Sequence, residues 1–211
     1  MEDIRREYHW LWNNGSMSTR TLNGDPWRRR LPRCATPALN RPWPPPGLAT
    51  QSVKALPRAF LHAWLVDRGS LTARLKIRCP QFRVILLTQR LEPAQPDECR
   101  LLGLRPAQKA WVREVLLCNG STPLVFAHSV LPRNNVRGAW NLFAGLGSGP
   151  LGDALFSNPA IARGPLSFKT INPHHSLFHR VARHTPKRIL QARRSLFVTR
   201  HKALLVTEIF L

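Results

Sequence analysis

Hydrophobic positions acquire a regular spacing only after Pro57. The segment PRAFLHAWLVDRG suits a helix, because proline fits the first helical position and Gly69 ends the run. The apolar residues that share one stripe of this helix are Phe60, Leu61, Trp64 and Leu65. Ser70 follows as a candidate N-cap for a second, short helix over LTARLKI, or it precedes a loop and the start of a strand.

The first 56 residues have a different character. They show no sustained helical or strand period and contain the stretch WPPPG at 43–47. We therefore expect a basic, Pro-rich and largely disordered tail over residues 1–56, followed by one domain over residues 57–211. The several tryptophans of this tail could still lie against the domain.

Strand patterns follow this helical region. FRVILLTQRL, at 82–91, is rich in β-branched and aromatic residues. AWVREVLLC and LVFAHSVLP then flank the turn signal Asn119-Gly120, which predicts a β-hairpin. Side chains alternate along a strand. One face of the first hairpin strand therefore carries Trp111, Arg113, Val115 and Leu117, and the other carries Val112, Glu114, Leu116 and Cys118.

The rest of the chain adds a glycine-rich loop and further strands. Glycines at 145, 147, 149 and 152 would let backbone amides approach a ligand, and PLGDALF begins a short helix. SFKTI, ARRSLFVT and ALLVTEIFL read as strands, the last two joined by a short turn at 200–202. Hairpin joins without an alternating strand-helix repeat predict an α+β fold, with an antiparallel β-sheet and helices flanking and covering it.

Two charged residues fall where this pattern places apolar side chains. Arg113 lies among large apolar groups, and Glu208 lies in the run KALLVTEIFL, which reads as buried on both faces. They are the only ionisable groups that we expect on the inner face of the sheet. Either they form a structural ion pair or reach water at strand ends. Or they face each other across an internal pocket, where Arg113 binds a carboxylate and Glu208 accepts a hydrogen bond from a hydroxyl.

The charge of the chain adds little specificity. The formal net charge is +21, spread over both parts: nine basic against four acidic residues up to Leu56, and twenty-three against seven from Pro57 onward. None of the known nucleic-acid fingerprints accompanies the short basic clusters, so we expect no specific nucleic-acid binding. A positive field can also draw in a small anionic substrate.

Other signals restrict the class of protein further. Four cysteines without a CxxC pair suit reduced thiols in a cytoplasm, the acidic start is unlike a secretory signal, and no apolar run could span a membrane. No cofactor motif is found, and we expect no metal, since Pro173 and the lack of a nearby carboxylate weaken the cluster of His174, His175 and His179. His128 reads as a structural histidine. Arg193 and Arg194 flank a pocket mouth or a solvated strand end.

The stretches WVREVLLCNGSTPLVFAHSVLP, GPLGDALF, ARRSLFV and LLVTEIFL resemble, in order and spacing, chorismate lyase (chorismate-pyruvate lyase). This bacterial enzyme makes 4-hydroxybenzoate and pyruvate from chorismate, the first step of ubiquinone biosynthesis. The similarity covers residues 57–211. It implies helical flaps that close over an internal site, and a reaction that needs no cofactor. We expect chorismate to be the small-molecule substrate and the chain to be a monomer.

The resemblance also implies roles for particular residues. The arginine of the family's WxRE stretch falls on Arg113, which would bind the ring carboxylate, and the glutamate of its TExF stretch falls on Glu208, which would hold the ring hydroxyl. Backbone contacts would come from Leu151 in PLG and from Leu71, where the family often has methionine.

Two other interpretations stay open at this point. The same sheet architecture is similar to the effector-sensing domain of a family of bacterial transcription regulators, which bind small ligands without converting them. Those regulators carry a winged helix in front, and the proline-rich tail argues against one here. The other interpretation is a degraded lyase that binds its ligand without turnover.

Overall fold

A computed structural model describes residues 58–138 and 140–211 of the chain. The predicted tail over residues 1–56 lies outside the described residues. The helices are α2 (Arg58–Leu65), α3 (Leu71–Arg78), α4 (Pro96–Leu102), α5 (Asn141–Gly145), α6 (Leu151–Ser157) and α7 (Phe178–Val181), with short 3₁₀ turns η3 (Arg133–Asn135) and η4 (Ala182–His184). The strands are β1 (Phe82–Pro93), β2 (Lys109–Asn119), β3 (Thr122–Pro132), β4 (Ala162–Arg163), β5 (Ser167–Ile171), β6 (Leu190–Thr199) and β7 (Lys202–Phe210).

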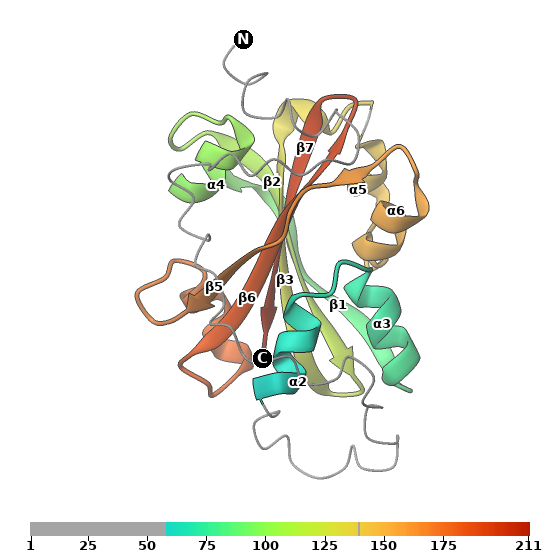
Figure 1. Cartoon of the computed structure of the whole chain (residues 1–211). Helices are drawn as coiled ribbons and strands as arrows, with labels where there is room; N and C mark the ends of the chain where they lie inside the picture. The colour runs from blue at the N-terminus through green and yellow to red at the C-terminus, as the bar shows by residue number, and fades with distance from the viewer. Residues whose placement is uncertain (1–57, 139) are drawn as a thin grey trace.

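The strands form one sheet in the order β1-β2-β3-β7-β6-β4, and β5 also pairs with β6. Each pairing between described strands is antiparallel. The predicted α+β fold with an antiparallel sheet is therefore confirmed. The last strand, β7, lies between β3 and β6 in the middle of the sheet (Figure 1). Because a central strand is covered on both faces, its run KALLVTEIFL is almost continuously apolar.

Helices cover both faces of the sheet (Figure 1). On one face, α2 and α3 pack on the part of β2 and β3 next to the β2–β3 turn. On the same face, α5 and α6 pack on the C-terminal end of β3 and on the part of β6 and β7 next to the β6–β7 turn. We call this the pocket face. On the opposite face, which we call the far face, α4 and α7 pack against the alternate residues of the same strands. The two faces divide the core into layers, as the alternation of side chains in the strands requires.

Local sequence signals account for the turns. In the predicted β2–β3 hairpin, Asn119 pairs with Thr122, and Gly120 adopts a left-handed backbone with φ of +57°. The β6–β7 hairpin has the same two-residue form, since Thr199 pairs with Lys202, but its turn residues Arg200 and His201 are not glycines. Both hairpins were predicted from the sequence. Their first strands, β2 and β6, begin and end within a few residues of the predicted bounds.

The starts of the helices show one confirmed and one missed prediction. Ser70 caps α3, because its side-chain oxygen accepts a hydrogen bond of 3.2 Å from the amide of Ala73. Helix α4 was not predicted, although Pro96 at its first turn and Gly103 at its C-cap are both typical signals.

Within the described part of the chain, no helix has the length and apolar character needed to cross a membrane.

Candidate active site

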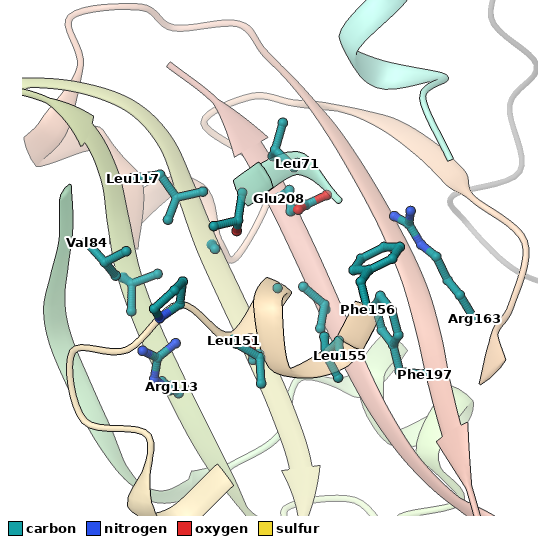
Figure 2. A pocket seen from close by; sticks show the side chains of 17 residues that line it. Leu71, Val84, Arg113, Leu117, Leu151, Leu155, Phe156, Arg163, Phe197 and Glu208 are labelled. Atoms are coloured by element: carbon teal, nitrogen blue, oxygen red, sulfur yellow. The ribbon is translucent and has the colours of Figure 1, made fainter. Parts of the chain in front are cut away.

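A pocket lies on the pocket face between the sheet and the N-terminal ends of α3 and α6 (Figure 2). Its walls are mostly apolar, and its charged lining residues are Arg113 of β2, Arg163 of β4 and Glu208 of β7. The predicted site residues Arg113, Glu208, Leu71 and Leu151 all line it. The tertiary structure thus brings together side chains from strands and helices that are distant in the sequence.

Arg113 is a buried cation that forms no ion pair with a carboxylate of the described residues. Its side chain is 2% exposed, and Nη2 donates hydrogen bonds to the carbonyl oxygens of Gly147 and Gly149, at 2.9 and 2.8 Å. Within residues 58–138 and 140–211 no acidic group forms an ion pair with it, and its Nε has no hydrogen-bond partner. Burial lowers the pKa of Arg113 to about 10. A guanidinium in this state favours a carboxylate that arrives from outside.

Glu208, in contrast, has a partner within the protein. Its Oε2 accepts a hydrogen bond of 2.5 Å from Nε of Arg193, which lies opposite it on β6. Arg193 is fully buried and also donates to the carbonyl oxygens of Trp64 and Asp67. The pair therefore fixes the Glu208 carboxylate and ties the end of α2 to the sheet.

Two expectations from the sequence need correction. Of the two alternatives for Arg193 and Arg194, the solvated strand end is wrong: they are 0% and 2% exposed, and Arg194 forms an ion pair of 2.8 Å with Asp97 on the far face. Arg113 and Glu208 are also not the only ionisable groups on the inner face, because Arg193 and Arg163 share it. The sequence left the place of Arg193 and Arg194 open and gave no signal for Arg163, because an arginine near a strand end reads as solvent-exposed unless its neighbours are known.

Arg113 and Glu208 lie on two strands separated by β3. Glu208 is level with Val115, through Ala127, so Arg113 is two residues further along β2. With strand spacings of about 4.8 Å and a rise of about 3.3 Å per residue, the two Cα atoms are about 12 Å apart. Both side chains line the pocket, Arg113 at one side of it and Glu208 further across the sheet (Figure 2).

The helices over the pocket contribute backbone groups. Leu71 and Leu151 are the first residues of α3 and α6, so their amides have no partner in the preceding helical turn. The two helix ends are in close contact, since a Cβ on Gly152 would come within 2.5 Å of the Thr72 hydroxyl. Only glycine permits this approach.

A second charged cluster lies on the far face, directly behind the pocket. His128 is 1% exposed, with Nδ1 and Nε2 each 3.0 Å from a carboxylate oxygen, of Glu114 and Glu98 respectively. Burial by itself lowers the pKa of His128, but the two carboxylates outweigh it and raise the pKa to about 9. Arg180 completes the cluster through an ion pair of 2.8 Å with Glu114. The prediction of a structural histidine agrees with these contacts.

Metal binding has no support in the described residues. No group of three histidine, cysteine or acidic side chains there is arranged to hold an ion. Of the three candidate histidines, only His179 lies within a helix, α7; His174 and His175 lie in the preceding turns. They therefore do not share the helical face that a pair of ligands would need.

The fold and the pocket define a class: an antiparallel-sheet protein with an internal pocket whose charged lining residues are two arginines and one glutamate. The family model for chorismate lyase matches residues 48–211, and the chain belongs to this family. A relative from Aromatoleum aromaticum named "Probable chorismate pyruvate-lyase" is 46% identical over 193 residues, which cover 90% of this chain and 93% of the relative. Another of the same name, from Nitrosomonas europaea, is 48% identical over 153 residues, covering 72% and 86%.

Among solved structures, the C-terminal domain of PhnF has a TM-score of 0.49 to this chain at 16% identity. The matched region covers 62% of this chain and 82% of the PhnF domain. A likeness of this size says nothing about function.

Proposed function

We propose that the chain is a carbon-oxygen lyase that converts chorismate to 4-hydroxybenzoate and pyruvate, the first step of ubiquinone biosynthesis. It acts in the cytoplasm as a monomer and without a cofactor. The names of its relatives support the reaction. The observation that carries the proposal is Arg113, a buried cation that has no carboxylate partner among the described residues and lines the same pocket as Glu208.

The ligand lies between the two charged side chains. Arg113 binds the ring carboxylate and Glu208 accepts a hydrogen bond from the ring hydroxyl, which is on the opposite side of the ring. The backbone amides at the starts of α3 and α6, at Leu71 and Leu151, add contacts from above. Arg193 holds the Glu208 carboxylate in one position, so this group is oriented before the ligand arrives.

The chemistry requires positioning more than a reactive side chain. The bond between the ring carbon and the enolpyruvyl oxygen breaks, and the hydrogen on the hydroxyl-bearing ring carbon passes to the enolpyruvyl methylene, which becomes the methyl group of pyruvate. Aromatisation of the ring supplies much of the driving force. A cyclic transfer of this kind needs no protein base and no covalent nucleophile. The pocket contributes by holding the side chain near that hydrogen and excluding water, and we assign Glu208 an orienting role.

The decisive experiment mixes the purified protein with chorismate and follows the ultraviolet absorbance of 4-hydroxybenzoate, with pyruvate measured separately. Both products are expected in equal amounts. A thermal shift with chorismate or 4-hydroxybenzoate but no product would refute the lyase and favour a ligand-sensing domain or a lyase that has lost turnover. Absence of both product and shift would refute the site as well.

Variants of the two charged residues test their roles. Arg113→Ala is expected to reduce turnover and affinity for 4-hydroxybenzoate together, because both substrate and product carry the ring carboxylate. Glu208→Ala is expected mainly to abolish the preference for 4-hydroxybenzoate over benzoate, which lacks the hydroxyl. Asp153→Ala serves as a control, since this half-exposed carboxylate on α6 lies outside the pocket. Wild-type rates in both site variants would show that the assignment is wrong.

A further inference from the structure

Arg163 is a second cation in the pocket, and no predicted role uses it. It lies on β4 opposite Phe197 of β6, which brings its side chain to the pocket face. Figure 2 shows it on the other side of Glu208 from Arg113. The strand order agrees, because β7 lies between β2 and β4. The three charged lining residues thus form a row across the sheet, positive, negative, positive.

Arg163 donates hydrogen bonds to neutral groups and forms no ion pair with an acidic residue of the described chain. Nε donates to the hydroxyl of Ser195 at 2.8 Å, and Nη1 donates to the carbonyl oxygens of Arg68 and Gly69 at 2.8 and 3.3 Å. Its remaining amino group, Nη2, donates no hydrogen bond within the described residues, where no carboxylate lies within ion-pair distance of it. Burial lowers the pKa of Arg163 to about 10, although the nearby carboxylates of Glu208 and Asp67 oppose part of this change.

Two aromatic rings hold the guanidinium in place. It lies 5.4 Å from the ring centroids of both Phe156 and Phe197, which also line the pocket. Fixed by these rings and by its neutral hydrogen-bond acceptors, Arg163 presents an oriented cation at one end of the site. Such a group is suited to planar recognition of a carboxylate.

The charges of the pocket match a dianion. Glu208 forms its ion pair with Arg193, so Arg113 and Arg163 remain as two cations in the pocket that form no ion pair with an acidic residue of the described chain. Chorismate carries two carboxylates, one on the ring and one on the enolpyruvyl side chain, whereas 4-hydroxybenzoate retains only the first. The enolpyruvyl group is attached to the ring carbon next to the one that bears the hydroxyl. A ligand whose hydroxyl lies at Glu208 therefore directs its side chain to the region beyond Glu208.

We propose that Arg163 binds the carboxylate of the enolpyruvyl side chain and is a specificity-determining residue that distinguishes chorismate from 4-hydroxybenzoate. This inference rests on the function proposed above. Arg163 holds the enolpyruvyl side chain while the carbon-oxygen bond breaks. The contact with this carboxylate is lost when pyruvate dissociates. The aromatic product keeps only its contacts with Arg113, Glu208 and the helix ends.

The test compares Arg163→Met and Arg163→Lys with the wild-type chain. For each, the KM and kcat for chorismate are measured together with the inhibition constant of 4-hydroxybenzoate. Loss of one charged hydrogen-bonded contact corresponds to a weakening of about tenfold or more. Arg163→Met is therefore expected to raise the KM for chorismate at least about tenfold, with the inhibition constant changed less than about twofold. Arg163→Lys is expected to recover part of the loss.

Controls separate this role from a purely structural one. Arg163 also joins the α2–α3 loop to β6, so its removal could loosen the pocket as a whole. In that case affinity for substrate and product would fall by the same factor, and the inference would be overturned. Arg133→Met, at an exposed arginine outside the pocket, controls for the general loss of positive charge and should leave both constants unchanged.

The outcomes also distinguish this inference from the proposed function. If the wild-type chain makes no 4-hydroxybenzoate from chorismate, the lyase activity itself is refuted. If it does, and Arg163→Met keeps the wild-type KM for chorismate, the lyase stands and the role of Arg163 is refuted. A variant that fails to fold is replaced in the comparison by Arg163→Lys, for which an unchanged ratio of the two constants would likewise overturn the role.

Discussion

Replacing Arg113 by methionine should remove ligand binding without destabilising the protein. Methionine has a similar length and adapts to irregular apolar space, so it can occupy the position of the arginine stem. What is lost is a charge that is 2% exposed and has no carboxylate partner among the described residues. A protein that buries such a charge in its active site is less stable without ligand than a variant with an apolar side chain there, because the charge is compensated only when the ligand binds.

The structure gives the magnitude. The lowering of the Arg113 pKa by burial, to about 10, corresponds to about 3 kcal/mol of cost for burying the charge, at about 1.4 kcal/mol for each tenfold change in proton affinity. The hydrogen bonds to Gly147 and Gly149 offset part of it. Their carbonyl groups lie in a loop near the surface, so water can replace the guanidinium. We expect the free energy of unfolding of Arg113→Met to lie between the wild-type value and about 3 kcal/mol above it.

Urea unfolding and thermal unfolding, each with and without 4-hydroxybenzoate, measure both effects. For a domain of this size a gain of 1 kcal/mol raises the Tm by about 2–4 °C. The ligand should raise the Tm of the wild-type chain and leave that of Arg113→Met unchanged. Such a result would show that the cost of the buried charge is recovered on binding.

Arg193→Met is the matched control. This arginine is as deeply buried, but it forms an ion pair with Glu208 and hydrogen bonds with the carbonyl groups of α2. Its removal leaves the carboxylate without its partner, and we expect a loss of about 3–5 kcal/mol. If Arg113→Met were destabilised by as much as Arg193→Met, Arg113 would be a structural group and the reasoning from its missing partner would fail.

Two further variants test the surroundings of the site. Gly152→Ala should separate α6 from α3 and lower the free energy of unfolding by about 1–3 kcal/mol, because its Cβ would lie 2.5 Å from the Thr72 hydroxyl. Urea unfolding would check this against Gly145→Ala, where no atom lies within 4 Å of the added Cβ; equal losses would refute the steric account. The second concerns His128, whose raised pKa of about 9 means that the folded state holds its proton more tightly than the unfolded state. The stability that this group contributes should be fully present below about pH 6.5 and should decline as the pH rises to about 9. In His128→Gln this part of the pH dependence of the unfolding free energy should vanish. A pH profile like that of the wild-type chain would refute the assignment to His128.

Local sequence signals determined much of the secondary structure. The Asn119-Gly120 turn, the Ser70 cap and the strand alternation around Arg113 each depend on residues close together in the chain, so they can be read without the fold. The same is true of α4, which starts at Pro96 and ends before Gly103; its signals were present but not used.

Sequence patterns also identified Arg113 and Glu208 as out of place, because a charge in an apolar run needs a partner wherever the run is buried. Only the tertiary structure decided what those partners are. Strand register puts Arg193 beside Glu208, and the pairing of the short strand β4 with β6 brings Arg163 to the pocket. Arg113 is left without an acidic group among the described residues. Contacts across a sheet join residues at sequence separations that no local period encodes, and a register shift of one residue would turn each of these side chains to the other face.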